Sequence, residues 1–180
     1  MGREADRPEK PDRENRAAHR WLAAHGAQYA PLNPIYLGDD LFSHQPMCEA
    51  VLAARGHFLF VRKPATHTLI GEYITGVRLE SVTERVKQGR VWSTRRYRWM
   101  IDVPPRDGKD ALKVNWLEIE IADAAGAVTY RNSFVTDLPV NRETVSRRAT
   151  RGRARWKIEN GSFNVLKTQG YNLEIGRAHV

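Results

Sequence analysis

A carboxylate interrupts an apolar helical stripe near the end of the chain, and it is the first candidate for chemistry. At about 100° per residue, one face of a helix carries Trp156, Phe163 and Leu166. Glu159 falls within that face, where a carboxylate is costly unless it has a partner. Two interpretations follow: Glu159 pairs with Arg155, one turn earlier, or it binds a metal ion.

A second acidic motif follows a short apolar stretch earlier in the chain. Residues 34–42 are typical of a strand that ends in two aspartates and a turn, and a helix is expected over residues 44–52. Asp39 and Asp40 are both candidate ligands at the end of this strand. The alternative is that they are only loop and cap residues, and a cap of the turn or helix start is the simpler role for Asp40.

The residues around Glu159 also carry a family resemblance. The sequence of Arg155, Glu159 and Lys167 resembles the third-carboxylate region of the DDE transposases of bacterial insertion sequences, with Lys167 one position beyond the commonest spacing. The broader family pattern has a Tyr three residues before the Arg, where this chain has Gly152. One subgroup is especially similar, because it has Gly-Arg-Ala-Arg-Trp-Lys-Ile-Glu-Asn followed by Phe-Asn-Val-Leu-Lys, as in residues 152–160 and 163–167.

The resemblance implies a fold and an activity. The fold is α/β (α+β), a ribonuclease H-like core interrupted by a β-rich insertion before the C-terminal catalytic helix. Asp39 stands three residues before Phe42, as the family's second aspartate stands before its aromatic, so Asp39 and Glu159 are the implied catalytic metal ligands. Arg155 and Lys167 would position phosphates. Two Mg²⁺ (or Mn²⁺) ions would support strand cleavage and strand transfer on DNA.

The resemblance also implies partners and an incomplete site. The partners are transposon-end and target DNA, with a homo-oligomer in the full-length parent. The family's first aspartate belongs on a strand before Asp39, but Asp6 and Asp12 lie in a polar, proline-containing stretch. We therefore interpret the chain as a fragment truncated at both ends and inactive alone. Family-like sequence stops at Glu174, and residues 175–180 resemble a translated sequencing adapter, a non-native tail.

The elements expected to position these residues divide the chain into five parts. Residues 1–15 are rich in charge and proline, which predicts a flexible arm. Residues 16–77 form the first part of the core, with helices over 16–29 and 68–74 and a buried strand over 58–61. Residues 78–140 alternate in polarity over 95–103, 114–121 and 128–136, which predicts the β-rich insertion with a hairpin at 123–126. Residues 141–174 are the C-terminal helical part, and residues 175–180 are the tail.

The charge of the chain suits a polyanionic partner. Lys and Arg number 29 against 21 Asp and Glu, a net charge of +8. The basic side chains of residues 141–160 are Arg142, Arg147, Arg148, Arg151, Arg153, Arg155 and Lys157. Helical spacing puts Arg153 and Lys157 on the face opposite the apolar stripe. Phosphate contact is the functional interpretation of this run, and a solvated helix face is the alternative.

A second basic set is interleaved with aromatic residues. It consists of Arg90, Arg95, Arg96 and Arg98 together with Trp92, Tyr97 and Trp99. Trp99 and Arg98 are candidate DNA contacts, because aromatic rings beside cations can stack on flipped or unpaired bases. The alternation could equally place these rings in the core of the insertion.

Other features narrow the class of protein. The chain of 180 residues is 41% hydrophobic, enough for one core, and it has neither a run long enough for a membrane helix nor a secretory signal. Cys48 is the single cysteine, so an intramolecular disulfide and a thiolate zinc cluster are excluded, and a reducing cytoplasm is expected. The alternative function is a non-catalytic basic DNA-binding or interaction module in which Asp39 and Glu159 are structural.

Overall fold

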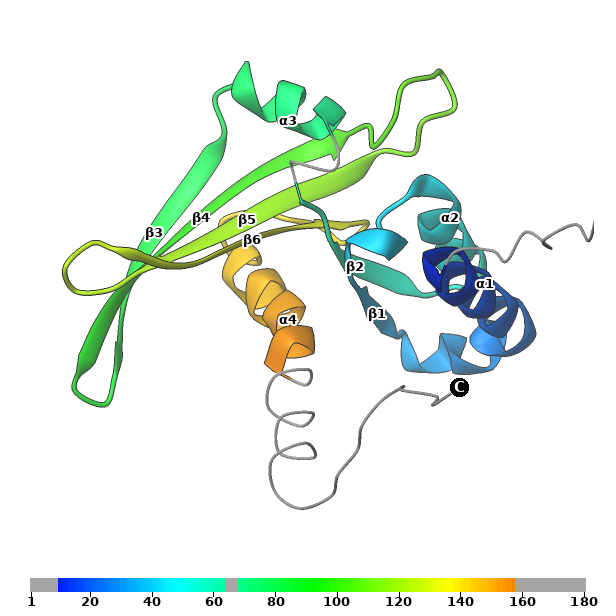
Figure 1. Ribbon diagram of the computed structural model, residues 1–180, viewed down its shortest axis with the longest axis horizontal. Helices are drawn as coiled ribbons and strands as arrows, with labels where there is room; N and C mark the ends of the chain where they lie inside the picture. Colours follow the sequence, from blue (N-terminus) through cyan, green and yellow to red (C-terminus); the bar gives the residue numbers. More distant parts are fainter. Residues whose placement is uncertain (1–9, 64–67, 158–180) are drawn as a thin grey trace, which may run out of the picture.

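A six-stranded mixed sheet forms the centre of the molecule (Figure 1). The computed structural model describes residues 10–63 and 68–157. The strands are β1 (Ile35–Gly38), β2 (His57–Val61), β3 (Glu80–Gln88), β4 (Val91–Val103), β5 (Val114–Ala122) and β6 (Val128–Thr136). The helices are α1 (Lys10–Tyr29), α2 (Gln45–Ala53), α3 (Thr68–Thr75) and α4 (Val145–Lys157), with short 3₁₀ turns η1 (Ala30–Leu32) and η2 (Asp40–Phe42). The predicted mixed α/β class is confirmed.

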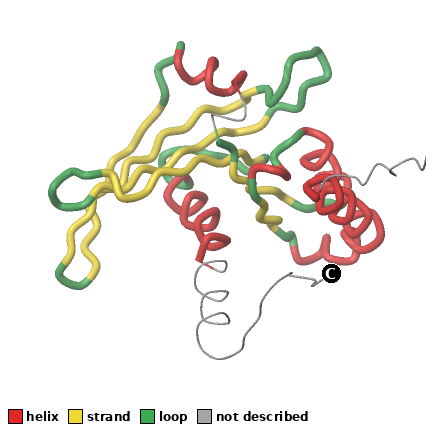
Figure 2. The backbone as a smooth tube through the Cα atoms, viewed as in Figure 1, coloured by secondary structure: helices red, strands yellow, loops and turns green. Residues whose placement is uncertain are grey.

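The strand order explains how the two halves of the sheet join. The order is β1-β2-β6-β5-β4-β3; β1 is parallel to β2, and every other pairing is antiparallel. The predicted hairpin at residues 123–126 is confirmed as the turn between β5 and β6. Because β6 pairs directly with β2, residues 78–140 continue the sheet that β1 and β2 begin, as the tube in Figure 2 shows.

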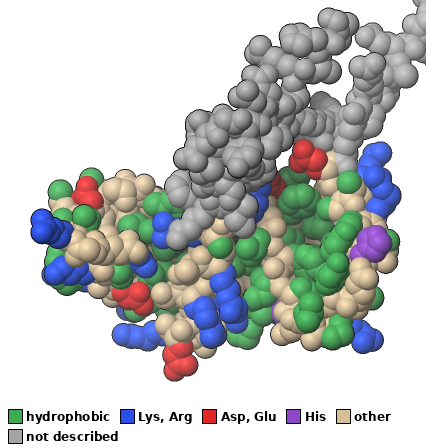
Figure 3. All heavy atoms as spheres, turned by 90° about the horizontal axis from the view of Figure 1, so that it is seen from below, with side chains coloured by type: hydrophobic (Ala, Val, Ile, Leu, Met, Phe, Trp, Pro, Cys, Tyr) green, Lys and Arg blue, Asp and Glu red, His purple; other side chains and the backbone are tan. Residues whose placement is uncertain are grey.

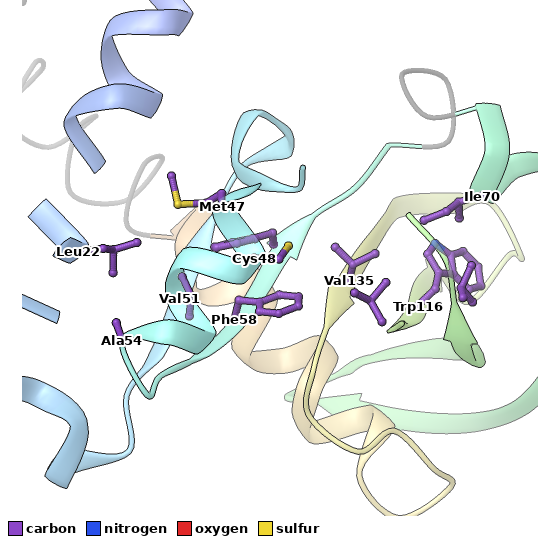
Figure 4. Close-up of a cluster of buried hydrophobic side chains, with 12 residues drawn as sticks. Leu22, Met47, Cys48, Val51, Ala54, Phe58, Ile70, Trp116 and Val135 are labelled. Carbon is purple, nitrogen blue, oxygen red and sulfur yellow. The ribbon is translucent and has the colours of Figure 1, made fainter. Parts of the chain in front are cut away.

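Alternation along the strands sends side chains into two cores, one on each face of the sheet. On one face, Phe58 and Phe60 of β2 pack in a cluster with Cys48 and Val51 of α2 (Figure 4). That cluster reaches Trp116 of β5 and residues of α1 and α3. The other face is covered by α4, and its cluster is Leu59, Tyr97, Trp99, Leu117, Ile119, Ile121, Phe134, Val140, Val145 and Ala149. The sheet is thus the middle of three layers.

Close packing of α4 on the sheet depends on a glycine. Gly152 is buried, and a Cβ added there would lie 2.6 Å from Cε1 of the Phe134 ring. A side chain at this position would force the helix away from β6. A glycine at position 152 therefore has a packing reason in this chain.

The start of the chain corrects one prediction. The flexible arm predicted over residues 1–15 is wrong for residues 10–15, because α1 begins at Lys10. Pro11 is tolerated near a helix start, where its missing N–H has no helical partner to lose. Leu22 anchors the helix in the core, being 6% exposed, and helix formation extends from such an anchored segment. Residues 1–9 lie outside the described part.

The helices give no sign of a membrane span. Of those within residues 10–63 and 68–157, none is both long enough and apolar enough to cross a bilayer. The longest, α1, has 20 residues but carries charged side chains along its length.

Candidate active site

Asp39 lies directly after the last residue of β1, at the end of the parallel strand pair. Its Oδ1 accepts a hydrogen bond from the Leu41 backbone N–H at 3.0 Å, so it caps the η2 turn. The strand end before it is tightly packed, since a Cβ on Gly38 would lie 2.8 Å from the Phe60 ring and 2.9 Å from the Phe42 ring. The carboxylate is therefore held on a closely packed strand end and remains 41% exposed.

Arg155 of α4 reaches this carboxylate from the far end of the sequence. Its Nη2 donates to Asp39 Oδ2 at 3.4 Å, across 116 positions of the chain. The structure thus joins the strand-end aspartate to α4. Glu159 and Lys167 lie outside the described residues, and so do the predicted Arg155–Glu159 pair and the Asp39–Glu159 separation.

Asp40 is directed elsewhere. Its Oδ1 accepts from the Lys63 backbone N–H at 2.8 Å, which ties the η2 turn to the chain that leaves β2. The cap expected of Asp40 at the turn is instead formed by Asp39. The two aspartates are therefore distinguishable by these contacts, since Asp39 pairs with Arg155 of α4 and Asp40 accepts from the Lys63 N–H.

A buried arginine supports the loop that carries both aspartates. Arg62 is 2% exposed; its Nη1 donates to the Ser43 carbonyl at 2.5 Å and its Nη2 to the Pro105 carbonyl at 2.8 Å. Burial lowers the pKa of its guanidinium, while the negative charge of Asp40 acts in the opposite direction. The sequence analysis missed this residue, although a charged residue directly after an apolar strand was a usable signal.

The described residues fit one part of a magnesium site. Mg²⁺ prefers carboxylate oxygens and usually keeps several waters, and the partly exposed Asp39 carboxylate suits that role. Within residues 10–63 and 68–157, no group of three or more His, Cys, Asp or Glu side chains comes together. The other predicted ligand, Glu159, lies outside this part.

Two of the arginines predicted to contact DNA from α4 lie differently from the prediction. Arg148 is 8% exposed, and burial, with the neighbouring charges of Arg147 and Arg151, lowers its pKa. The Arg148 side chain is therefore buried rather than on the surface, which does not agree with its predicted phosphate contact. Arg153 is half-buried rather than solvated, and its guanidinium carbon lies 4.6 Å from the centre of the Tyr130 ring.

The other basic positions of the predicted run on α4 are Arg147, Arg151 and Lys157, and Arg147 is exposed. Arg151 is exposed. Lys157 is the last residue of α4, and its side chain lies outside the described part. The basic run of residues 141–160 is thus divided between the core, the flank of the helix and the surface.

The aromatic residues of β4 are mostly core residues. Trp99 is 4% exposed in the cluster beneath α4, so the prediction that it stacks on a DNA base is wrong, and the alternative of a core ring holds. Tyr97 is fully buried in the same cluster. Trp92 is 41% exposed, with the cations of Arg85 and Lys87 at 5.0 and 5.5 Å from its ring centre.

The sheet face opposite α4 carries a network of ion pairs. Arg98 donates to Glu118 Oε1 from Nε at 3.0 Å and from Nη2 at 2.5 Å. Arg131 pairs with Glu120 at 2.5 Å. Arg98, which was predicted to contact DNA, therefore already has a carboxylate partner within the protein.

The surface differs between the two ends of the molecule. Figure 3 shows Lys and Arg side chains at the left end, which is the side of the β3–β4 hairpin in Figure 1. Hydrophobic surface lies toward the helical end.

Sequence comparisons add no family to this geometry. No protein-family model matches the chain, and no curated protein matches it either. The site is therefore interpreted from its own residues. The decisive ones are Asp39 and Arg155, because they join two motifs that are far apart in the sequence.

Proposed function

We propose that this chain is part of a DDE transposase that cleaves DNA strands and transfers them to a target in a metal-dependent reaction. The observation that carries the proposal is the 3.4 Å contact between Arg155 and Asp39. The two motifs lie far apart in the sequence, with 116 positions between Asp39 and Arg155, and this contact supports the proposal that they belong to one site. Glu159 follows Arg155 by four residues, about one helical turn.

In this proposal, Asp39 and Glu159 hold Mg²⁺ (or Mn²⁺) through their carboxylate oxygens. The bound ions supply activation of the attacking oxygen and stabilisation of the leaving oxygen. Arg155 orients the Asp39 carboxylate through Oδ2, while the Leu41 N–H fixes Oδ1. In this proposal Arg155 also contacts a phosphate of the DNA strand, and Lys167 has the same phosphate-positioning role.

The surroundings of the site suit a DNA substrate in the cytoplasm. The net charge of +8 favours a polyanion through counterion release. Arg151 adds an exposed cation to α4, the helix of Arg155. Cys48 is a buried free thiol, and burial raises its pKa to about 12, so it stays protonated and unreactive.

A second candidate is a non-catalytic basic DNA-binding or interaction module. One observation favours it: Asp39 already has the partners of a structural cap, with Leu41 on one oxygen and Arg155 on the other. In that function, the Asp39–Arg155 pair only holds α4 against the end of β1.

Manganese binding distinguishes the two functions. Electron paramagnetic resonance of Mn²⁺ titrated into the whole chain gives the bound fraction for the unaltered protein and for Asp39→Asn, Glu159→Gln and Asp40→Asn. Asp40→Asn is the matched control, since it removes the same charge one residue away and its carboxylate contacts Lys63 instead. We expect Asp39→Asn and Glu159→Gln each to weaken binding by about tenfold or more, with Asp40→Asn close to the unaltered chain. Equal binding by all four proteins would overturn the proposal and favour the module.

A further inference from the structure

A cavity of about 490 Å³ lies on the other flank of α4, away from Asp39. The β3–β4 hairpin, β5, β6 and α4 enclose it, and its polar lining comes from Gln88, Ser93, Arg95, Thr129, Tyr130, Thr150 and Arg153. Pockets of roughly 300–1,000 Å³ are typical of small-molecule sites. The volume therefore suits a ligand the size of a nucleotide.

Two arginines supply the chemistry of this cavity. Arg153 is braced against the Tyr130 ring at 4.6 Å, and Arg95 projects from β4 on the face that α4 covers. The Nε atoms of both arginines are buried and have no hydrogen-bond partner among the described residues. Within residues 10–63 and 68–157, neither arginine belongs to an ion pair of 4.0 Å or less, in contrast to Arg96 and Arg98 on the opposite face.

The lining of the cavity lacks compensating charge. No Asp or Glu of the described residues lines it. Glu84 faces Arg95 in the strand register, but its Oε2 is directed toward the Ser146 hydroxyl at 3.5 Å. Arg90, in the turn between the lining residues Gln88 and Val91, adds a further cation beside the cavity. The electrostatic field inside therefore favours an anion.

The hydroxyls of the lining show which groups would bind that anion. Ser93 donates to the Val86 carbonyl at 3.4 Å, Thr129 to the Ile121 carbonyl at 3.2 Å and Thr150 to the Ser146 carbonyl at 2.9 Å. Their hydrogens are thus already in use. The lining also has the Gln88 amide and the Tyr130 hydroxyl as donors, but only the two guanidinium groups carry a positive charge. A guanidinium binds phosphate in two parallel hydrogen bonds.

We propose that this cavity binds a sugar-phosphate through Arg95 and Arg153, with the phosphate between the two guanidinium groups. The sugar-phosphate has two sources, a backbone phosphodiester of DNA or a free nucleotide. The DNA source rests on the proposed function and adds a second contact to it, on the flank of α4 opposite Asp39. The phosphate chemistry itself does not depend on the metal site.

The first experiment uses the unaltered whole chain, so it does not depend on whether a variant folds. Nuclear magnetic resonance of the arginine Nε–Hε signals is recorded with EDTA present, during titration with inorganic phosphate, with thymidine monophosphate, and with a DNA duplex of about 20 base pairs. We expect the Arg95 and Arg153 signals to shift in a saturable manner, and the Arg96 signal to stay in place. Because EDTA removes divalent metal, failure of the metal site leaves this result unaffected.

Variants then identify the source of the phosphate. Arg95→Gln and Arg153→Gln are compared with Arg96→Gln, which makes the same charge change on the opposite sheet face. If DNA is the source, each cavity variant lowers the salt dependence of duplex binding by about one released counterion, and Arg96→Gln does not. If a free nucleotide is the source, the cavity variants lose thymidine monophosphate binding by at least about tenfold, with duplex binding unchanged. Absence of saturable shifts with all three probes, or cavity variants that behave as Arg96→Gln, would overturn the proposal.

Discussion

Arg153 and Arg155 stand two positions apart on α4, yet they meet opposite chemistry. Two residues of helix correspond to about 200° of rotation, so the two side chains leave the helix on opposite flanks. Arg155 meets the carboxylate of Asp39 at 3.4 Å, whereas Arg153 meets the ring of Tyr130 at 4.6 Å. One flank pairs its cation with a carboxylate, and the other places its cation against a neutral ring.

The comparison shows how one helix can serve two sites. Gly152, between the two flanks, lets α4 lie directly on Phe134 and so fixes the direction of both arginines. A paired arginine orients a carboxylate, while an arginine against an aromatic ring keeps its charge for an incoming anion. In our two proposals, the same basic run thus serves the metal site with Arg155 and the cavity with Arg153.

The largest expected effect comes from the loop beneath the Asp39 flank. Arg62→Ala removes charge-assisted hydrogen bonds to the Ser43 and Pro105 carbonyls and leaves both acceptors buried. We expect the free energy of unfolding in urea to fall by about 2–4 kcal/mol. The matched control is Arg96→Ala, whose side chain is 57% exposed and which should cost less than about 1 kcal/mol. Equal losses in the two variants would mean that Arg62 does not hold the loop.

A smaller effect is expected from the residue that positions both flanks. Gly152→Ala brings a Cβ within 2.6 Å of the Phe134 ring, an overpacking cost of about 1–3 kcal/mol, partly offset by about 1 kcal/mol of helix propensity. Unfolding in urea should therefore show a net loss of about 0–2 kcal/mol. Gly76→Ala is the control, because the nearest atom to its Cβ is the Glu72 carbonyl oxygen at 4.0 Å. A stabilised Gly152→Ala protein would contradict the close seating of α4.

The smallest expected effect is the coupling across the Asp39 flank. A double-mutant cycle of Asp39→Asn and Arg155→Gln should give a coupling energy of about 0–1 kcal/mol, because both side chains are partly exposed, 41% and 27%. The pair would then orient the carboxylate with little contribution to stability. A coupling above about 2 kcal/mol would instead mark a structural pair and support the non-catalytic module.

The elements of the fold were largely predictable from local patterns. Alternating polarity located β5 and β6 and the turn between them, because a half-buried strand repeats every two residues. The pairing of β6 with β2 was not predictable, since the register Leu59↔Thr136 joins residues far apart in the sequence and leaves no local signal. The start of α1 at Lys10 was missed, because the polar composition of residues 1–15 does not show how far a helix extends from the segment that packs in the core.

The candidate site was predictable only in part. Motif spacing selected Asp39 and Arg155, and the structure brings these two together. Other predicted contacts depended on burial, since Trp99 and Arg148 belong to the core. Their residue types alone did not reveal this, because it follows from the packing of α4 on the sheet. Arg95 and Arg153 come from separate elements, so their shared cavity has no signature in the sequence.

The most direct test of the central claim is a crystal structure of the whole chain soaked with Mn²⁺. The anomalous signal locates the metal, and the map gives the distance between the carboxylates of Asp39 and Glu159. The account predicts a manganese peak bound by both carboxylates, which should lie roughly 4–8 Å apart. Carboxylates on opposite sides of the fold, with no metal at Asp39, would contradict the transposase site and leave only the basic module.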